Sequence, residues 1–508
     1  MKKCLIVIIS FLCAGEMFSQ KDSYFPQVFF DKKQAEAQLG YGKSTIEGVA
    51  FTREKRNVPL TMGMVKAKMG KKHVARPNTV IMLFPVTEYF TEFYNLRRKI
   101  ESSKKQVLMS KEAFAVRREA YTDDYGRFKF ENLKVGKYYI EKPIVQGGMG
   151  VGVSWDQLAG NVSKNGALGT ISGICTGYYD NLKYCKKVVN GRPIGADALN
   201  SREAMLELFK NARKICGDKP LACNILHALT DYSKIVEYAL EAGANIIVTG
   251  AGLPLELPKL VENYPDVAIV PIVSSGRALK IICKKWKAAG RLPDAVIVEG
   301  PKSGGHQGVK ADDLFLPEHQ LESIVPEVKE ERDKWGDFPI IAAGGIWDND
   351  DIQKIMALGA DAVQLGTRFI GTYECDASEE FKNILINAKK EDIVIVKSPV
   401  GYPGRAVKTN LIKNLTHDNP TIKCYSNCVT PCNLGEEARK VGFCIANCLS
   451  DSYNGKVDTG LFFSGENGYR IEKLISVEEL INELMTPTKN SILAKVNSEN
   501  VVENTVNF

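Results

Sequence analysis

The stretch PIIAAGGIWDNDDIQKIMALGADAVQLGTRFI, residues 339–370, places a helix-like segment between two apolar ones. The flanking segments, PIIAAGG (339–345) and AVQLGTRFI (362–370), are largely apolar and contain glycine where each apolar run stops. Nearly continuous apolar strands that alternate with helices are typical of a parallel sheet. This stretch therefore predicts a strand, a helix and a second, parallel strand.

The same alternation runs through the chain from Pro143 onward. Eight such units predict a (β/α)₈ barrel, a TIM barrel of the α/β class, with its chemistry on the loops at the carboxyl ends of the strands. An open doubly wound sheet fits less well, because its first turn would read G-x-G-x-x-G and QGGMGVG does not. We place the barrel at residues 136–490, with a C-terminal cap from about residue 374. The expected strands are 143–148, 168–172, 221–226, 245–252, 268–275, 295–300, 339–345 and 362–370.

Glycines follow the last two predicted strands, in AAGG (342–345) and QLGT (364–367). In barrels of this type, the loops after strands seven and eight form a phosphate site from backbone N–H groups. The alternative is that these are turn glycines only. The candidate phosphate contacts are Gly344, Gly345, Gln364, Leu365, Gly366 and Thr367.

Two other strand ends carry residues suited to a flat ligand. QGGMG (146–150) ends the first strand, and its glycines let a backbone approach a planar ring closely. Asn224 ends the third strand and can hydrogen-bond a ring carbonyl.

The segment GPKSGGHQG (300–308) surrounds His306 with glycines. A histidine with a pKa near neutral suits general base catalysis. Among the other histidines, only His227 lies near a strand end, and we interpret it as pocket lining. The alternative for GPKSGGHQG is a glycine-rich surface turn with an incidental histidine.

Four segments together resemble the nitronate monooxygenase family, formerly called 2-nitropropane dioxygenases, and its relatives the flavin-dependent enoyl-ACP reductases. They are PIVQGGMGVGVSWDQLAGNVSKNGALGTIS (143–172), EGPKSGGHQG (299–308), residues 339–369 and SPVGYPGRAV (398–407), and the resemblance covers about residues 134–485. It implies an FMN-binding TIM barrel with His306 as the catalytic residue. The implied FMN contacts are Gly147, Gly148, Met149, Gly150, Asn224, Gly304, Gly305, Gly344, Gly345, Gln364, Leu365, Gly366 and Thr367.

The resemblance implies oxidation of alkyl nitronates or nitroalkanes with O₂. An NAD(P)H-dependent enoyl-ACP reductase acting on an enoyl thioester is the alternative within enzymes. An exported binding protein with an inactive barrel is the alternative from another class. Many family members carry an acidic residue and an alanine where this chain has Lys302 and Ser303, which bears on substrate identity.

The residues before the barrel are predicted to form a leader and a separate small domain. MKKCLIVIISFLCAGEMFSQ (1–20) has the layout of a secretory signal peptide, and its apolar run from Cys4 to Leu12 is too short for a membrane span. Residues 21–135 read as a small β-rich domain. YTDDYGRFKFENLKVGKYYI (121–140) predicts turns and strands and resembles the end of a carboxypeptidase-regulatory-like β-sandwich. We expect residues 491–508 to be a disordered tail.

Composition argues against a nucleic-acid partner and gives conflicting indications of the cellular compartment. The net charge of +7 in 508 residues is dispersed, so no nucleic-acid surface is expected. Of 13 cysteines, 11 lie from Cys175 onward, scattered as in a reduced cytoplasmic protein, whereas the leader favours export. We expect no metal site and interpret the five cysteines with C-x₃-C spacing as free thiols in a helical cap. The alternative is that they bind zinc or an iron–sulfur cluster: Cys424, Cys428, Cys432, Cys444 and Cys448.

Overall fold

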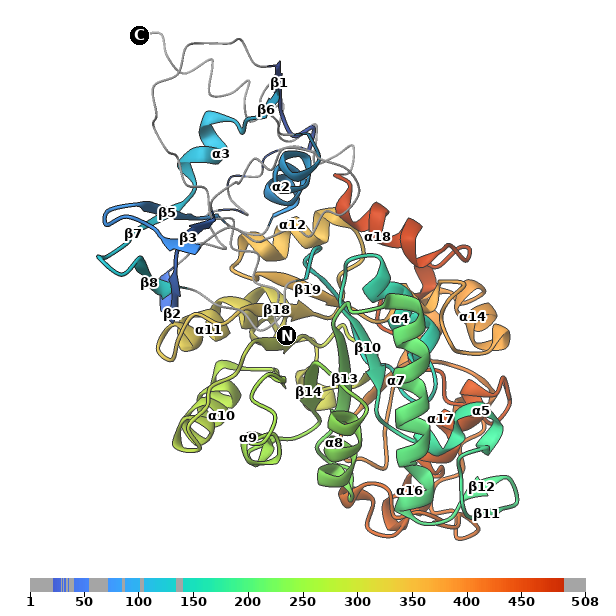
Figure 1. Ribbon diagram of the computed structural model, residues 1–508. Helices are drawn as coiled ribbons and strands as arrows, with labels where there is room; N and C mark the ends of the chain where they lie inside the picture. The colour runs from blue at the N-terminus through green and yellow to red at the C-terminus, as the bar shows by residue number, and fades with distance from the viewer. Residues whose placement is uncertain are drawn as a thin grey trace, which may run out of the picture. The chain divides into compact units, whose positions relative to one another are not determined.

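The computed structural model describes residues 22–28, 30, 32, 35, 41–53, 72–84, 87–100, 105–133 and 140–487 (Figure 1). Contacts divide the chain into two compact units, residues 1–136 and 137–508. The expected leader, the expected tail and the segments 58–70 and 134–139 lie outside the described residues.

The second unit is built on a closed, eight-stranded parallel barrel. The first strand pairs with the last, and a parallel bridge from Val145 to Leu168 joins it to the second, so the ring is complete. All eight expected strands are present, and the predicted (β/α)₈ barrel is confirmed. The strands are β9 (Ile144–Gln146), β10 (Gly169–Ser172), β13 (Leu221–Leu226), β14 (Ile246–Gly250), β15 (Ala268–Val273), β16 (Val296–Glu299), β18 (Ile340–Ala343) and β19 (Ala362–Leu365).

Helices surround the strands, as Figure 1 shows for α7, α8, α10 and α11. The segment LELPKLVENY (255–264), expected to be helical, forms only the short α9. Its backbone continues through single turns, in which the Tyr264 N–H donates to the Val261 carbonyl at 2.9 Å. The outer elements are α4 (Asp156–Lys164), α7 (Arg202–Cys216), α8 (Tyr232–Glu241), α9 (Leu257–Leu260), α10 (Gly276–Ala288), α11 (Leu321–Asp333), α12 (Asn349–Ala357) and α13 (Thr367–Ile370).

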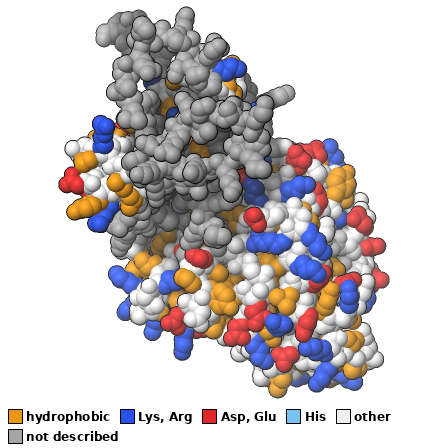
Figure 2. Space-filling model, in the orientation of Figure 1, with side chains coloured by type: hydrophobic (Ala, Val, Ile, Leu, Met, Phe, Trp, Pro, Cys, Tyr) orange, Lys and Arg blue, Asp and Glu red, His pale blue; other side chains and the backbone are white. Residues whose placement is uncertain are grey.

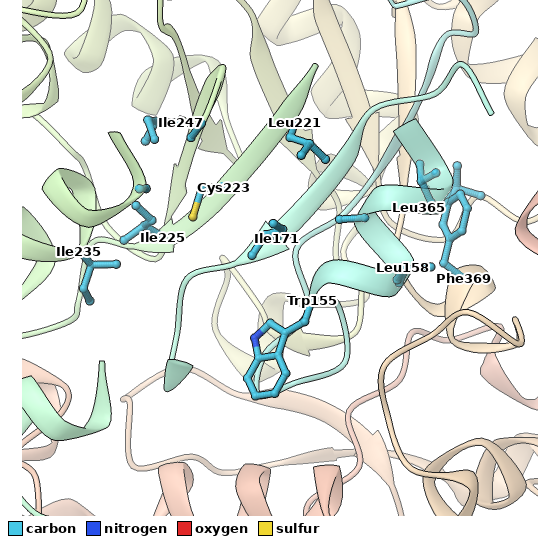
Figure 3. Packing of buried hydrophobic residues seen from close by; sticks show 14 of the residues in the cluster. Trp155, Leu158, Ile171, Leu221, Cys223, Ile225, Ile235, Ile247, Leu365 and Phe369 are labelled. Atoms are coloured by element: carbon cyan, nitrogen blue, oxygen red, sulfur yellow. The ribbon is translucent and has the colours of Figure 1, made fainter. Parts of the chain in front are cut away.

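Two apolar cores follow from the alternation of side chains along each strand. In β13 the side chains of Leu221, Cys223 and Ile225 pack outward with residues of the surrounding helices, such as Ile235 of α8 (Figure 3). Ala222, between the first two, packs in the barrel interior. Asn224, which follows Cys223, therefore also faces the barrel interior. The same alternation determines which side chains reach the interior at the other strand ends.

A cap follows the eighth strand and adds a small antiparallel sheet. In this sheet β21 pairs on one side with β20 and on the other with β17, which contains His306. The small sheet consists of β17 (Gly305–His306), β20 (Ile393–Val396) and β21 (Gly404–Val407). The helices of the cap are α14 (Glu379–Ile386), α15 (Asn410–Lys413), α16 (Glu436–Val441), α17 (Ile445–Tyr453) and α18 (Val477–Met485). The connection between β10 and α7 contains α5 (Tyr179–Leu182), β11 (Val188–Val189), β12 (Arg192–Pro193) and α6 (Ala196–Leu199).

The described part of the first unit combines strand pairs with two helices. The DDYG turn is formed, with the Gly126 N–H donating to the Asp123 carbonyl at 3.0 Å, and β8 follows it. The sandwich-like character of this unit stays a prediction. Its elements are β1 (Asp22–Tyr24), β2 (Tyr41–Val49), β3 (Phe51–Arg53), β4 (Lys72–Val74), β5 (Val80–Leu83), α2 (Glu88–Ile100), β6 (Lys105–Val107), α3 (Lys111–Ala115), β7 (Arg118–Tyr121) and β8 (Arg127–Leu133).

Among the residues described, none of the helices has both the length and the apolar character needed to cross a lipid bilayer.

Candidate active site

A cavity of about 1000 Å³ opens at the carboxyl ends of the barrel strands. This is the end of a TIM barrel at which active sites form. All the residues that the sequence marked for catalysis or cofactor binding line it, although they come from five separate segments: Gly147, Gly148, Met149, Gly150, Asn224, Gly304, Gly305, His306, Gly344, Gly345, Gln364, Leu365, Gly366 and Thr367.

Several polar side chains in the cavity wall have buried atoms without a hydrogen-bond partner. Among the described residues these include the amide oxygens of Asn224 and Gln364, the hydroxyl of Ser303 and the amide oxygen of Gln307. Buried polar atoms are normally satisfied, so such a group at a cavity surface indicates a polar ligand.

Two positions of the cavity wall must be glycine because neighbouring atoms lie too close to leave room for a Cβ. A Cβ at Gly148 would lie 2.4 Å from the Cβ of Asn224, so only glycine lets this turn pack against the end of β13. Gly344 has a φ of +101°, and a Cβ there would lie 2.7 Å from the Gly300 carbonyl oxygen. The loops at the ends of β9 and β18 therefore present backbone to the cavity.

The loops after β18 and β19 are fixed by a cap segment that the sequence did not mark. The Gly465 N–H donates to the Thr367 hydroxyl at 2.8 Å, and the Asn467 side chain donates to the Gly345 carbonyl at 2.8 Å. Both cap residues also line the cavity. Because neither lies near a strand end, only tertiary contact identifies them.

His306 is held in the cavity wall by residues distant in sequence. Its Nε2 lies 2.6 Å from the hydroxyl oxygen of Ser398, and its ring meets Phe463 edge-on with the ring centroids 5.2 Å apart. The Ser398 oxygen also accepts the Val400 N–H at 3.3 Å. The imidazole is therefore fixed at one nitrogen and on one side of the ring.

The protonation behaviour of His306 differs from the sequence expectation of a pKa near neutral. Burial lowers its pKa to about 4, because the low-dielectric surroundings disfavour the imidazolium. The ring is therefore neutral at pH 7 and carries a free electron pair. A neutral imidazole can still accept a proton, and an anion formed beside it would stabilise the resulting cation.

Glu299 is a residue of the cavity that the sequence reading missed. It ends β16, and the strand alternation turns its side chain inward because Val298 packs outward. Burial raises its pKa to about 7, and the Ser303 hydroxyl opposes this rise although it lies beyond strict hydrogen-bond geometry. The signal in the sequence was a glutamate directly after the apolar run AVIV.

Two further side chains of the cavity wall, His227 and Lys302, bear on the sequence predictions. His227, the rival to His306, has its Nε2 3.1 Å from a carboxylate oxygen of Glu256. Lys302 has its Nζ 3.9 Å from the Glu466 carboxylate. His227 is thus paired at the wall, and Lys302 adds a partly compensated positive charge.

The remaining sequence predictions concern the surface and the cysteines. Figure 2 shows basic and acidic side chains interspersed over the visible face of the barrel unit. The described cysteines are free thiols. Four of the five cysteines with C-x₃-C spacing line a second, small cavity in the cap, whereas Cys448 does not: Cys424, Cys428, Cys432 and Cys444.

The model of a family described as nitronate monooxygenase matches residues 131–487. Among curated relatives, a probable nitronate monooxygenase of Staphylococcus aureus strain JH9 is 24% identical over 315 residues, which cover 56% of this chain and 81% of the relative. The relative from strain Newman is 25% identical over the same length.

Two solved structures show the same barrel fold. FabK from Thermotoga maritima has a TM-score of 0.53 at 23% identity and covers 72% of this chain and 96% of its own. A nitroalkane oxidase from Streptomyces ansochromogenes has a TM-score of 0.51 at 20% identity and covers 70% of this chain and 98% of its own.

Proposed function

Because the chain belongs to the nitronate monooxygenase family and is an enzyme of that class, we propose that it is an FMN-dependent oxidoreductase that oxidises alkyl nitronates and nitroalkanes with O₂. The observation that carries this proposal is the placement of His306. A neutral, half-buried imidazole lies in the wall of a large cavity, fixed by Ser398 and Phe463.

The cavity residues fit a flavin. The unpartnered amide oxygens of Asn224 and Gln364 suit the N–H edge of a planar heterocycle. The turn containing Gly148 lets the backbone lie against a ring, and the loops containing Gly344 and Gly366 bring main chain to the place expected for a phosphate. FMN, when bound, supplies the electron-accepting and oxygen-reducing chemistry.

The protein residues supply position and proton transfer. A nitroalkane must lose its α-proton before it becomes an electron-rich nitronate. His306, neutral at pH 7, can take this proton, and the electron pair moves toward the nitro group as the imidazolium forms. The new anion and the new cation then stabilise each other in a cavity of low dielectric.

The size of the cavity favours one alternative. A volume of about 1000 Å³ is at the upper end for ligand pockets, which leaves room for a second extended molecule beside a flavin. This supports an NAD(P)H-dependent enoyl reductase as the second candidate. Lys302 does not separate the two, because a nitronate and the phosphate of a carrier-bound thioester are both anionic.

The two functions are separated by the spectrum and turnover of the purified protein. We expect a yellow protein that releases FMN on denaturation and consumes oxygen with a nitronate. Oxidation of NAD(P)H with an enoyl thioester, without oxygen uptake from nitronate, would favour the enoyl reductase. A colourless protein that binds no added FMN would contradict both and favour a binding protein with an inactive barrel.

Replacement of Gly366 by leucine is expected to weaken flavin binding by at least about tenfold, or about 1.4 kcal/mol. A Cβ at Gly366 would lie 3.3 Å from the sulfur of Met149, so the rest of a leucine must displace that side chain or enter the cavity. Fluorescence titration of the apoprotein with FMN measures the effect.

The matched control is Gly336→Leu. A Cβ at Gly336 would have only the Phe338 ring nearby, at 3.8 Å, and this glycine does not line the cavity. We expect this variant to bind FMN as the wild type does. Undiminished affinity in Gly366→Leu would contradict the proposed phosphate position.

A further inference from the structure

A second, small cavity lies in the cap and is lined by four cysteines. Its volume of about 10 Å³ is far below the several hundred Å³ of an organic ligand site. Metal atoms bonded to sulfur need less open space, because they lie about 2.3 Å from it, well inside van der Waals contact. The cysteines come from the loop before η5 (Thr430–Cys432), from η5 itself and from the N-cap of α17: Cys424, Cys428, Cys432 and Cys444.

The four cysteines line the same small space. All four are free, so no disulfide accounts for their proximity. Because no histidine or carboxylate is among the residues that line this space, the four cysteines offer a metal only sulfur ligands there.

A backbone amide donates to one of these sulfur atoms. The Asn427 N–H donates to the sulfur of Cys424 at 3.4 Å. Amide hydrogen bonds to cysteine sulfur stabilise thiolates and tune the clusters that they bind.

The loop that carries these cysteines is tied to the barrel. The Thr230 N–H donates to the Cys428 carbonyl at 3.2 Å, and the Thr430 N–H donates to the Ala228 carbonyl at 3.0 Å. Leu229 and Val429 form an antiparallel bridge between these bonds. The thiols are therefore held by the connection that follows β13, one of the strands that end at the large cavity.

The arrangement distinguishes between kinds of metal centre. Within the described residues, no three histidine, cysteine, aspartate or glutamate side chains converge closely enough to hold one metal ion. A tetrahedral zinc site requires such convergence. In an iron–sulfur cluster the four thiolates are divided among two or four iron atoms, so they do not all converge on one metal ion.

We propose that the cap binds an iron–sulfur cluster through Cys424, Cys428, Cys432 and Cys444. Binding of the cluster is independent of flavin binding, whereas its position beside a flavin rests on the proposed function. Cys428, Val429 and Ile445 line both cavities, so the cluster shares a wall with the proposed flavin site.

The test is metal and sulfide analysis of the full chain purified without oxygen, with flavin measured separately in the same sample. We expect iron and acid-labile sulfide in equal amounts, roughly two to four of each per chain, and a paramagnetic resonance signal in one oxidation state. Zinc without sulfide would overturn the cluster. So would protein that binds neither, even after treatment with ferrous iron and sulfide. Because flavin is counted independently, loss of one proposal is distinguishable from loss of the other.

Cysteine variants locate the cluster. Cys428→Ser is expected to lower bound iron by at least about tenfold, since even residues one shell outside the ligands change metal affinity by that much. Cys448→Ser is the matched control: Cys448 lies one turn along α17 from Cys444, yet does not line the small cavity. Equal iron loss in both variants would contradict the assignment.

A measurement on the unaltered protein guards against a variant that fails to fold. We expect four fewer cysteines to react with a thiol reagent in the holoprotein than after removal of the metal under conditions that keep the fold. An unchanged count of reactive thiols would overturn the proposal. The exposed Cys424 offers a milder variant, Cys424→Ser, which should lose iron while the circular dichroism spectrum stays that of the wild type.

Discussion

Replacement of His306 by alanine is expected to slow turnover of a neutral nitroalkane by about a hundredfold or more, while the protein keeps its flavin. The loss follows from the proposed role of the imidazole as base, since the ring lines the cavity and is neutral at pH 7. Flavin is retained because most of its expected contacts come from other strand ends, and the adjacent Gly304 and Gly305 have no side chain that the substitution removes. Steady-state oxygen uptake and the flavin content of the same preparation measure the two properties.

The choice of substrate separates proton removal from positioning. A preformed nitronate has already lost its proton, so its turnover in His306→Ala should fall much less than that of the nitroalkane. Equal losses with both substrates would mean that His306 positions the substrate. The control is His417→Ala, because the His417 ring contacts the Val441 carbonyl at 3.0 Å and does not line the cavity.

The pH dependence follows from the direction of the pKa shift. Burial lowers the pKa of His306 from 6.5 to about 4, so the neutral base persists as the pH falls from 7 to 5. The comparison is made in Glu299→Gln, because burial raises the pKa of the Glu299 carboxyl to about 7 and this group also titrates in the range. In that variant we expect kcat/KM for the nitroalkane to stay level between pH 7 and 5 and to decline only near pH 4. A decline centred near pH 6.5 in that variant would contradict a base with a lowered pKa.

Local signals in the sequence were sufficient to predict the barrel. The apolar runs that became β14, β15 and β18 are continuous, and glycine or polar residues mark where they stop. In a parallel barrel these stops meet at one end, so the residues after them share a cavity. The same logic predicted that Asn224 reaches this end of the barrel, where it lines the cavity, whereas Gly304 and Gly305 were expected from the family resemblance.

The supports of the site could not be predicted, because they depend on long-range pairing. Ser398 reaches His306 across 92 residues, through the pairing of β17 with β21. β17 is only two residues long and gives no strand signal. The pKa of His306 was mispredicted for the same reason, since burial is a property of the assembled cavity. Glu299 was missed because a polar residue after a strand also reads as an ordinary strand end.

Asp376 is the second residue whose replacement we expect to have a large effect, in this case on the stability of the fold. Its carboxylate accepts the N–H groups of Trp155 at 2.7 Å, Gln157 at 3.0 Å and Leu158 at 3.1 Å. These are the first amides of α4, whose own N-cap residue, Trp155, provides no side-chain acceptor. A carboxylate from beyond the eighth strand thus caps the helix that follows the first.

Replacement of Asp376 by alanine is expected to lower the free energy of unfolding by about 3 kcal/mol. Loss of a helix cap typically costs about 1 kcal/mol, and buried donors left without an acceptor cost about 1–3 kcal/mol more. Chemical denaturation of the flavin-free protein measures the change. Asp376→Asn keeps one oxygen acceptor and should lose less.

An ordinary cap provides the control for Asp376. Asp348 caps α12 within its own segment by accepting the Asp351 N–H at 3.2 Å, so Asp348→Ala should cost only about 1 kcal/mol. The larger loss at Asp376 should also weaken FMN binding, because α4 begins directly after the turn that contains Gly148 and Met149. If Asp376→Ala were destabilised no more than Asp348→Ala, this long-range cap would not be what holds the first strand–helix connection against the cavity.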